Sequence, residues 1–169
     1  MHGMVVLRVC VVAAVAFAIP LGAAGSLEAS AEPAPDFALK SLTGENLRLS
    51  EYLGEVVVLS FWSTDCGTCV LQMPAIQKLY EQHRDDGLQV LGINIDRNPR
   101  KAREMVEKLE LAYPVLFDAE RSVSREYKLN ALPFVVVIDR DGAIRYTHSS
   151  YRSTDRYLYR GQINELLAE

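Results

Sequence analysis

The 169-residue chain has few cysteines and histidines, the residues from which structural zinc sites are most often built. It contains three cysteines and three histidines, and only Cys66 and Cys69 stand close together. A structural zinc site usually needs two closely spaced pairs of Cys or His ligands, and the sequence offers no second pair. The formal net charge of −4 gives no footprint for nucleic acid. These shortages leave redox chemistry or a structural disulfide as the main uses of the two cysteines.

Long apolar runs are also scarce. Arg8 precedes an apolar run from Val9 to Leu21, roughly 13 to 16 residues, whereas a membrane span needs about 20. The small residues Ala29-Ser30-Ala31 form a candidate cleavage site. We expect residues 1–31 to be a signal peptide that exports the chain to the periplasm or the extracytoplasmic face, with an uncleaved N-terminal anchor as the alternative. Residues 32–169 then form one domain.

The stretch around Cys66-Gly67-Thr68-Cys69 carries the chemistry. An apolar run over 56–61 precedes it, and a helical pattern of apolar residues follows it. The sequence therefore predicts a strand that delivers Cys66 to the start of a helix. The N–H groups and dipole of a helix N-terminus lower the pKa of a cysteine thiol from about 8.5. We predict Cys66 as the attacking thiol and Cys69 as the resolving thiol, with an inert structural disulfide as the alternative.

Strands and helices alternate along the rest of the domain. We expect a hairpin at 37–49, a helical turn capped by Ser50, and a last helix that buries Leu158, Ile163, Leu166 and Leu167. Further strands are predicted at 56–61, 88–95, 114–117, 134–138 and 143–146, and helices from 66 to 84, from 99, from 122 to 127 and from 155. This pattern predicts an α/β fold with a mixed sheet and helices on both faces, with the Cys66 turn at the carboxyl end of a central strand.

The chain resembles the thioredoxin superfamily, and within it the TlpA/ResA-like extracytoplasmic thiol–disulfide oxidoreductases, relatives of the proteins that serve cytochrome c maturation. The motifs that carry the resemblance are Ala34-Pro35-Asp36-Phe37, the run from Val56 to Trp62, Cys66-Gly67-Thr68-Cys69, Met73-Pro74, Asp118, Leu132-Pro133 and Ile138-Asp139-Arg140-Asp141-Gly142. The resemblance covers residues 34 to 167. It implies a thioredoxin-like fold with an N-terminal β-hairpin and an extra helix and strand around 99–117, inserted before the strand that follows Pro133.

The resemblance also implies a set of site residues. The Leu132-Pro133 bond is expected to be cis and to face the disulfide, which leaves the Leu132 backbone free to pair with an extended substrate. Trp62 is expected beside the site, and the predicted substrate-binding residues are Trp62, Gly67, Thr68, Leu132 and Pro133. The expected partners are disulfide-bearing protein substrates and a membrane electron donor. No cofactor or metal is required, and the domain is expected to be a monomer.

Several residues depart from the family pattern. Ser60 and Gln72 stand where relatives carry a buried Asp or a Glu, so the usual group that deprotonates the resolving thiol is missing. Asp65 precedes Cys66, where a carboxylate either raises the thiol pKa or marks solvent exposure. Gly67-Thr68 lacks the common proline. These departures predict a less acidic dithiol and a reduction potential near that of thioredoxin, about −270 mV.

Two other functions remain open at this point. A peroxiredoxin-like peroxidase needs a Pro and a Thr ahead of the cysteine, where this chain has Leu59 and Ser63. A copper-binding or metallochaperone module would use the two thiols with His148, which the sequence places on an exposed strand. The aromatic and basic segment 149–160 is either a partner surface or a solvated helix face.

Overall fold

The computed structural model of the protein describes residues 32–169, so the predicted signal peptide lies outside the described residues. The strands are β1 (Ala38–Ser41), β2 (Asn46–Arg48), β3 (Val56–Trp62), β4 (Leu88–Asn94), β5 (Val115–Phe117), β6 (Phe134–Ile138) and β7 (Ile144–His148). The helices are α1 (Gly67–His83), α2 (Pro99–Lys108), α3 (Ser122–Glu126) and α4 (Asp155–Leu167), and short 3-10 turns are η1 (Leu49–Tyr52) and η2 (Arg84–Asp86).

The strands form one mixed sheet of seven in the order β2-β1-β5-β4-β3-β6-β7. The parallel strands β3, β4 and β5 form its centre, and β6 pairs antiparallel with β3 on the other side. The predicted hairpin is present, because β1 pairs antiparallel with β2. α2 and β5 lie between β4 and β6 in the chain, where the extra helix and strand were expected. β3 is therefore a central strand that carries its carboxyl end directly to α1.

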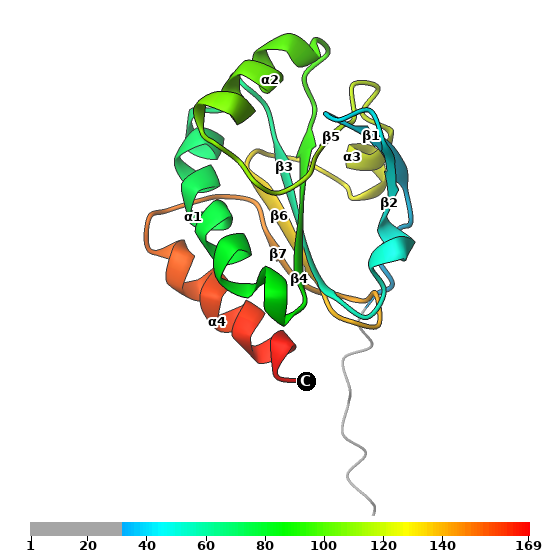
Figure 1. Ribbon diagram of the computed structural model, residues 1–169, viewed down its shortest axis with the longest axis vertical. Helices are drawn as coiled ribbons and strands as arrows, with labels where there is room; N and C mark the ends of the chain where they lie inside the picture. The colour runs from blue at the N-terminus through cyan, green and yellow to red at the C-terminus, as the bar shows by residue number, and fades with distance from the viewer. Residues whose placement is uncertain (1–31) are drawn as a thin grey trace, which may run out of the picture.

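Two apolar cores hold β3 in place, one on each face of the sheet. Alternate residues of a strand point to opposite faces. Val56, Val58 and Trp62 join the core under α1, α2 and α4, whereas Leu59 and Phe61 join the core toward α3 and η1. Figure 1 shows α1, α2 and α4 together on one side of the sheet and α3 with the β1–β2 hairpin on the other. All seven residues of β3 are buried, as the predicted central strand requires.

Two local predictions are wrong. Leu158 is 48% exposed, and Tyr159 occupies the core position beside Ile163 and Leu166 instead. Tyr159, Ile163 and Leu166 lie at the i, i+4 and i+7 spacing of one helix face. Leu158 precedes Tyr159 by one residue, so its side chain is turned about 100° away from that face. Ser50 lies inside η1 rather than capping it, because its N–H and hydroxyl both donate to the carboxylate of Asp36.

No helix within residues 32–169 combines the length and the apolar character that crossing a bilayer requires.

Candidate active site

Cys66 lies at the N-terminus of α1, four residues beyond the carboxyl end of β3. It is the N-cap residue, and its Sγ accepts a hydrogen bond of 3.1 Å from the backbone N–H of Cys69. The two cysteines form a disulfide with a Cα–Cα distance of 5.2 Å. The predicted pairing of the redox disulfide is therefore present, and the structure shows its oxidised form. The N–H groups at a helix N-terminus are the groups that stabilise a thiolate once the bond is reduced.

The two sulfur-bearing residues differ in access to solvent. Cys69 is 0% exposed and belongs to the core under α1, whereas Cys66 is partly exposed. Gly67 and Thr68 are exposed, and the Thr68 hydroxyl oxygen lies 3.5 Å from Cys66 Sγ. In this disulfide form Cys66 is therefore the more accessible of the two sulfur atoms, and which thiol attacks stays a prediction.

A carboxylate at the end of β4 holds the loop that leads to Cys66. The backbone N–H of Thr64 donates to Asp96 at 3.0 Å, and Asn94 Nδ2 donates to the same carboxylate at 3.0 Å. The Ile95 N–H donates to the Trp62 carbonyl oxygen, so the ends of β3 and β4 stay together beyond the last strand residues. Sequence reasoning missed this role of Asp96. The available signal was a carboxylate directly after a buried parallel strand, at the edge of the sheet where Cys66 also lies.

The peptide bond between Leu132 and Pro133 is cis. Phe134 pairs with Phe61 in the β3–β6 register, so Pro133 lies across from Trp62 at the edge of the sheet that carries Cys66. Leu132 is partly buried against both apolar cores. The structure thus brings the predicted proline segment to the same end of the sheet as the disulfide.

Trp62 lies below this surface rather than on it. Its side chain is 1% exposed and packs in the core that also contains Cys69 and Met73. Its indole nitrogen has no hydrogen-bond partner among the described residues. A side chain buried to this extent supports the CxxC turn from beneath and offers no surface to a docked protein.

Behind Cys69 stand neutral polar groups where relatives are expected to carry an acid. Gln72 is 1% exposed, and its Nε2 donates to the hydroxyl of Tyr159 on α4 at 2.9 Å. Burial raises the pKa of Tyr159 to about 12, so the hydroxyl stays protonated at neutral pH. Ser60 is also buried, at 3% exposure. Neither position supplies a base near neutral pH, whereas Asp65 is exposed at the surface beside Cys66.

His148 does not lie on a bare surface strand. Its Nε2 lies 2.9 Å from Gln162 Oε1, and its ring centroid lies 5.0 Å from that of Tyr159. Among residues 32–169, no three Cys, His, Asp or Glu side chains are grouped so that they could hold a metal ion. The copper-binding alternative gains no support from this geometry.

A strand that leads to a CxxC at a helix N-terminus, opposite a cis-proline segment, defines a thioredoxin-like fold. The chain belongs to the AhpC/TSA family, whose profile matches residues 31–147. It is similar to a structure described as a candidate thiol:disulfide interchange protein DsbE from Chlorobium tepidum, with a TM-score of 0.78 and 31% identity over 81% of this chain and 96% of that one.

Several of the relatives that the chain matches are named thiol-disulfide oxidoreductase ResA. The thiol-disulfide oxidoreductase ResA of Halalkalibacterium halodurans is 31% identical over 73% of this chain and 70% of its own length. ResA of Geobacillus kaustophilus is 33% identical over 66% of this chain, and the match spans 64% of that relative. The chain thus spans slightly less than two thirds of the length of some of the relatives it matches.

Proposed function

We propose that the protein is a thiol–disulfide oxidoreductase that reduces protein disulfides outside the cytoplasm. The observation that carries the proposal is the asymmetric disulfide at the start of α1, with Cys66 accessible and Cys69 fully buried. The names of the ResA and DsbE relatives support the same chemistry. The expected signal peptide or anchor over residues 1–31 supports a place of action outside the cytoplasm. Disulfides of client proteins form in such oxidising compartments.

In the reaction that we propose, the Cys66 thiolate attacks one sulfur of a substrate disulfide. The Cys66–substrate bond forms, the substrate S–S bond breaks, and the first substrate sulfur leaves as a thiolate that takes up a proton. Cys69 then attacks Cys66 Sγ, which releases the second substrate thiol and forms the Cys66–Cys69 disulfide. Two electrons pass to the substrate, and a dithiol donor must return them by the reverse exchange. Leu132 and Pro133 would hold the substrate backbone beside Cys66.

The relationship to cytochrome c maturation belongs to this proposal and rests on resemblance alone. It would make a haem-attachment cysteine pair the client and a membrane dithiol protein the electron donor. We expect the domain to act as a monomer without a cofactor, since both reacting groups come from one chain.

A redox titration tests the proposal and its direction. The purified domain is equilibrated in dithiothreitol or glutathione buffers, its free thiols are alkylated, and the products are weighed by mass spectrometry. We expect one two-electron transition near the thioredoxin value of about −270 mV. A transition near the DsbA value of about −120 mV would identify an oxidant. No transition across this range would leave an inert structural disulfide.

A peroxidase is the remaining enzymatic alternative. The position where its proline is required holds Leu59, which is 0% exposed and pairs with Leu91 and Val136 in the middle of the sheet. Proline removes a backbone donor and is not tolerated in a central strand. Turnover of peroxide that depends on Cys66 would nevertheless overturn the oxidoreductase proposal.

A further inference from the structure

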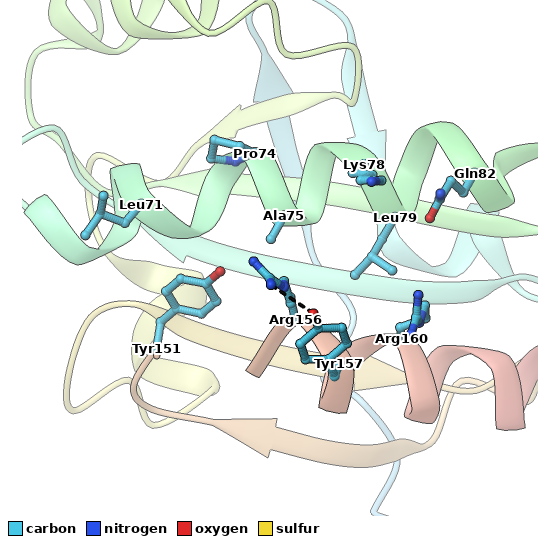
Figure 2. A pocket seen from close by; sticks show the side chains of 10 residues that line it. All are labelled: Leu71, Pro74, Ala75, Lys78, Leu79, Gln82, Tyr151, Arg156, Tyr157 and Arg160. Atoms are coloured by element: carbon cyan, nitrogen blue, oxygen red, sulfur yellow. Dashed lines mark hydrogen bonds between the residues drawn. The ribbon is translucent and has the colours of Figure 1, made fainter. Parts of the chain in front are cut away.

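A groove runs between α1 and α4 on the side of the molecule away from the β1–β2 hairpin. It encloses about 600 Å³, and its walls include Leu71, Pro74 and Lys78 of α1 and Arg156, Tyr157 and Arg160 of α4. Figure 2 shows the α1 side chains facing the α4 side chains across it. We call this hollow the α1–α4 groove.

The α1–α4 groove is basic although the chain as a whole is acidic. Its lining contains Lys78, Arg156 and Arg160 and no carboxylate, while the formal net charge of the chain is −4. All three cations are exposed, and within residues 32–169 none of them forms an ion pair. They are therefore free to meet negative charges from another molecule.

The Tyr157 ring packs against two of these cations, Arg156 and Arg160. The guanidinium carbons of Arg156 and Arg160 lie 4.7 and 5.5 Å from the centroid of the Tyr157 ring. Arg156 Nη2 also donates a hydrogen bond of 2.9 Å to the Tyr157 hydroxyl, as the dashed line in Figure 2 indicates. Stacking of this kind limits the freedom of the arginine side chains, so less entropy is lost when they bind an anion.

The groove also presents apolar surface. Leu71 is 70% exposed on α1, and Tyr157 is 55% exposed on α4. Large apolar side chains with this exposure beside unpaired cations are typical of a surface that binds a mixed apolar and acidic segment. The hollow shape suits a peptide chain that enters between the helices, whereas a flat bilayer would touch only its rims.

The position of the groove relative to the disulfide sets the reach of such a segment. Leu71 and Lys78 lie five and twelve residues beyond Cys66, which corresponds to about 7 and about 18 Å along a helix with a rise of 1.5 Å per residue. An extended peptide advances about 3.3 Å per residue. A segment that starts at Cys66 would thus reach Lys78 after about five or six residues.

We propose that the α1–α4 groove docks an acidic segment of the protein whose disulfide reacts with Cys66. The acidic residues would lie about five or six positions from the reacting cysteine of the partner. This inference rests on the proposed oxidoreductase function and deepens it, because it adds a charge requirement to substrate choice.

The test compares two peptide disulfides, each a dimer joined through its one cysteine. One peptide carries Asp-Glu-Glu about five to seven residues from the cysteine, and the other carries Asn-Gln-Gln at the same positions. Each peptide is made in two versions, with the cysteine before or after this segment. The second-order rate constant for reduction by the reduced protein is measured at about 0.02 M and about 0.3 M salt. We expect the acidic peptide to react about three- to tenfold faster at low salt, as two or three exposed ion pairs would allow.

Two triple variants with the same change in charge separate docking from overall electrostatics. The groove variant is Lys78→Gln, Arg156→Gln and Arg160→Gln, and we expect the acidic-to-neutral rate ratio to fall to about one. The control variant is Arg100→Gln, Lys101→Gln and Lys108→Gln on the exposed face of α2, and we expect it to keep the ratio.

Each other outcome has a defined meaning. A ratio of about one in the unmodified protein, or an equal loss of the ratio in both variants, would overturn the docking proposal. If the ratio is one and only the unmodified protein, not the groove variant, sediments with phosphatidylglycerol vesicles, the occupant of the groove is a membrane. If instead only the unmodified protein self-associates, the occupant is a second copy of the chain. No reduction of either peptide would contradict the proposed function itself.

Discussion

Replacing Gln72 with glutamate would place a carboxyl group one helical turn from the buried Cys69, the proposed resolving cysteine. The side chain is 1% exposed and its partner is the hydroxyl of Tyr159, which can donate one hydrogen bond to a carboxylate. Burial disfavours the charged form, so we expect the pKa of the new carboxyl group to rise above its value in the unfolded chain. The folded variant then binds more protons than the unfolded one, and its stability falls as the pH rises above about 4.3.

The size of this effect follows from linkage. Between the pKa of this carboxyl group in the unfolded chain and its pKa in the folded variant, the free energy of unfolding falls by about 1.4 kcal/mol per pH unit. If the pKa in the folded variant lies above 7, the variant therefore loses about 3 to 4 kcal/mol of stability between pH 4.3 and 7. Urea unfolding of the oxidised protein at a series of pH values measures it. Gln82→Glu is the control, because Gln82 is exposed on the same helix. Parallel pH profiles for the two variants would refute the reasoning and would mean that water reaches position 72.

Three further predictions concern the support of the site. Asp96→Ala removes the acceptor for the Thr64 N–H and should lower the free energy of unfolding by about 1 to 3 kcal/mol; an unchanged urea midpoint would contradict the role of the carboxylate. Gly92→Ala would place a Cβ 2.9 Å from Tyr113 Cε2, and we expect a loss of about 1 to 3 kcal/mol from overpacking, whereas an unchanged melting temperature would show that the core can adjust. Because burial raises the pKa of Tyr159 to about 12 from an ordinary value of 10.0, the folded state retains a proton that the unfolded state loses, and stability should fall from pH 10 to 12. Tyr159→Phe should reduce that slope, and an unchanged slope would place the effect on other tyrosines.

The main chain of the site could be predicted from sequence because its signals are local. A continuous apolar run identifies a strand buried on both faces, and the CxxC directly after it marks the start of a helix. The family resemblance implied the cis bond at Leu132-Pro133, which is present. The strands expected at 134–138 and 143–146 are present as β6 and β7, which pair antiparallel.

The remaining features depend on contacts between segments that are distant in sequence. The Asp96 carboxylate reaches Thr64 across 32 positions, and Gln72 meets Tyr159 across 87. Such pairs cannot be read from one sequence. The phase of α4 was misjudged for a related reason, since Tyr159 rather than Leu158 faces the core and hydropathy alone favours the leucine. The α1–α4 groove exists only once both helices are packed on the sheet.

The central claim is that Cys66 attacks and Cys69 resolves. It is tested most directly by reacting the Cys69→Ser and Cys66→Ser variants of the domain with one peptide disulfide and weighing the products. Because Cys69 is 0% exposed, we expect the Cys69→Ser variant to accumulate a mixed disulfide on Cys66 rapidly, while the Cys66→Ser variant reacts at least about a hundredfold more slowly. Equal rates of adduct formation, or a faster reaction at Cys69, would contradict the account.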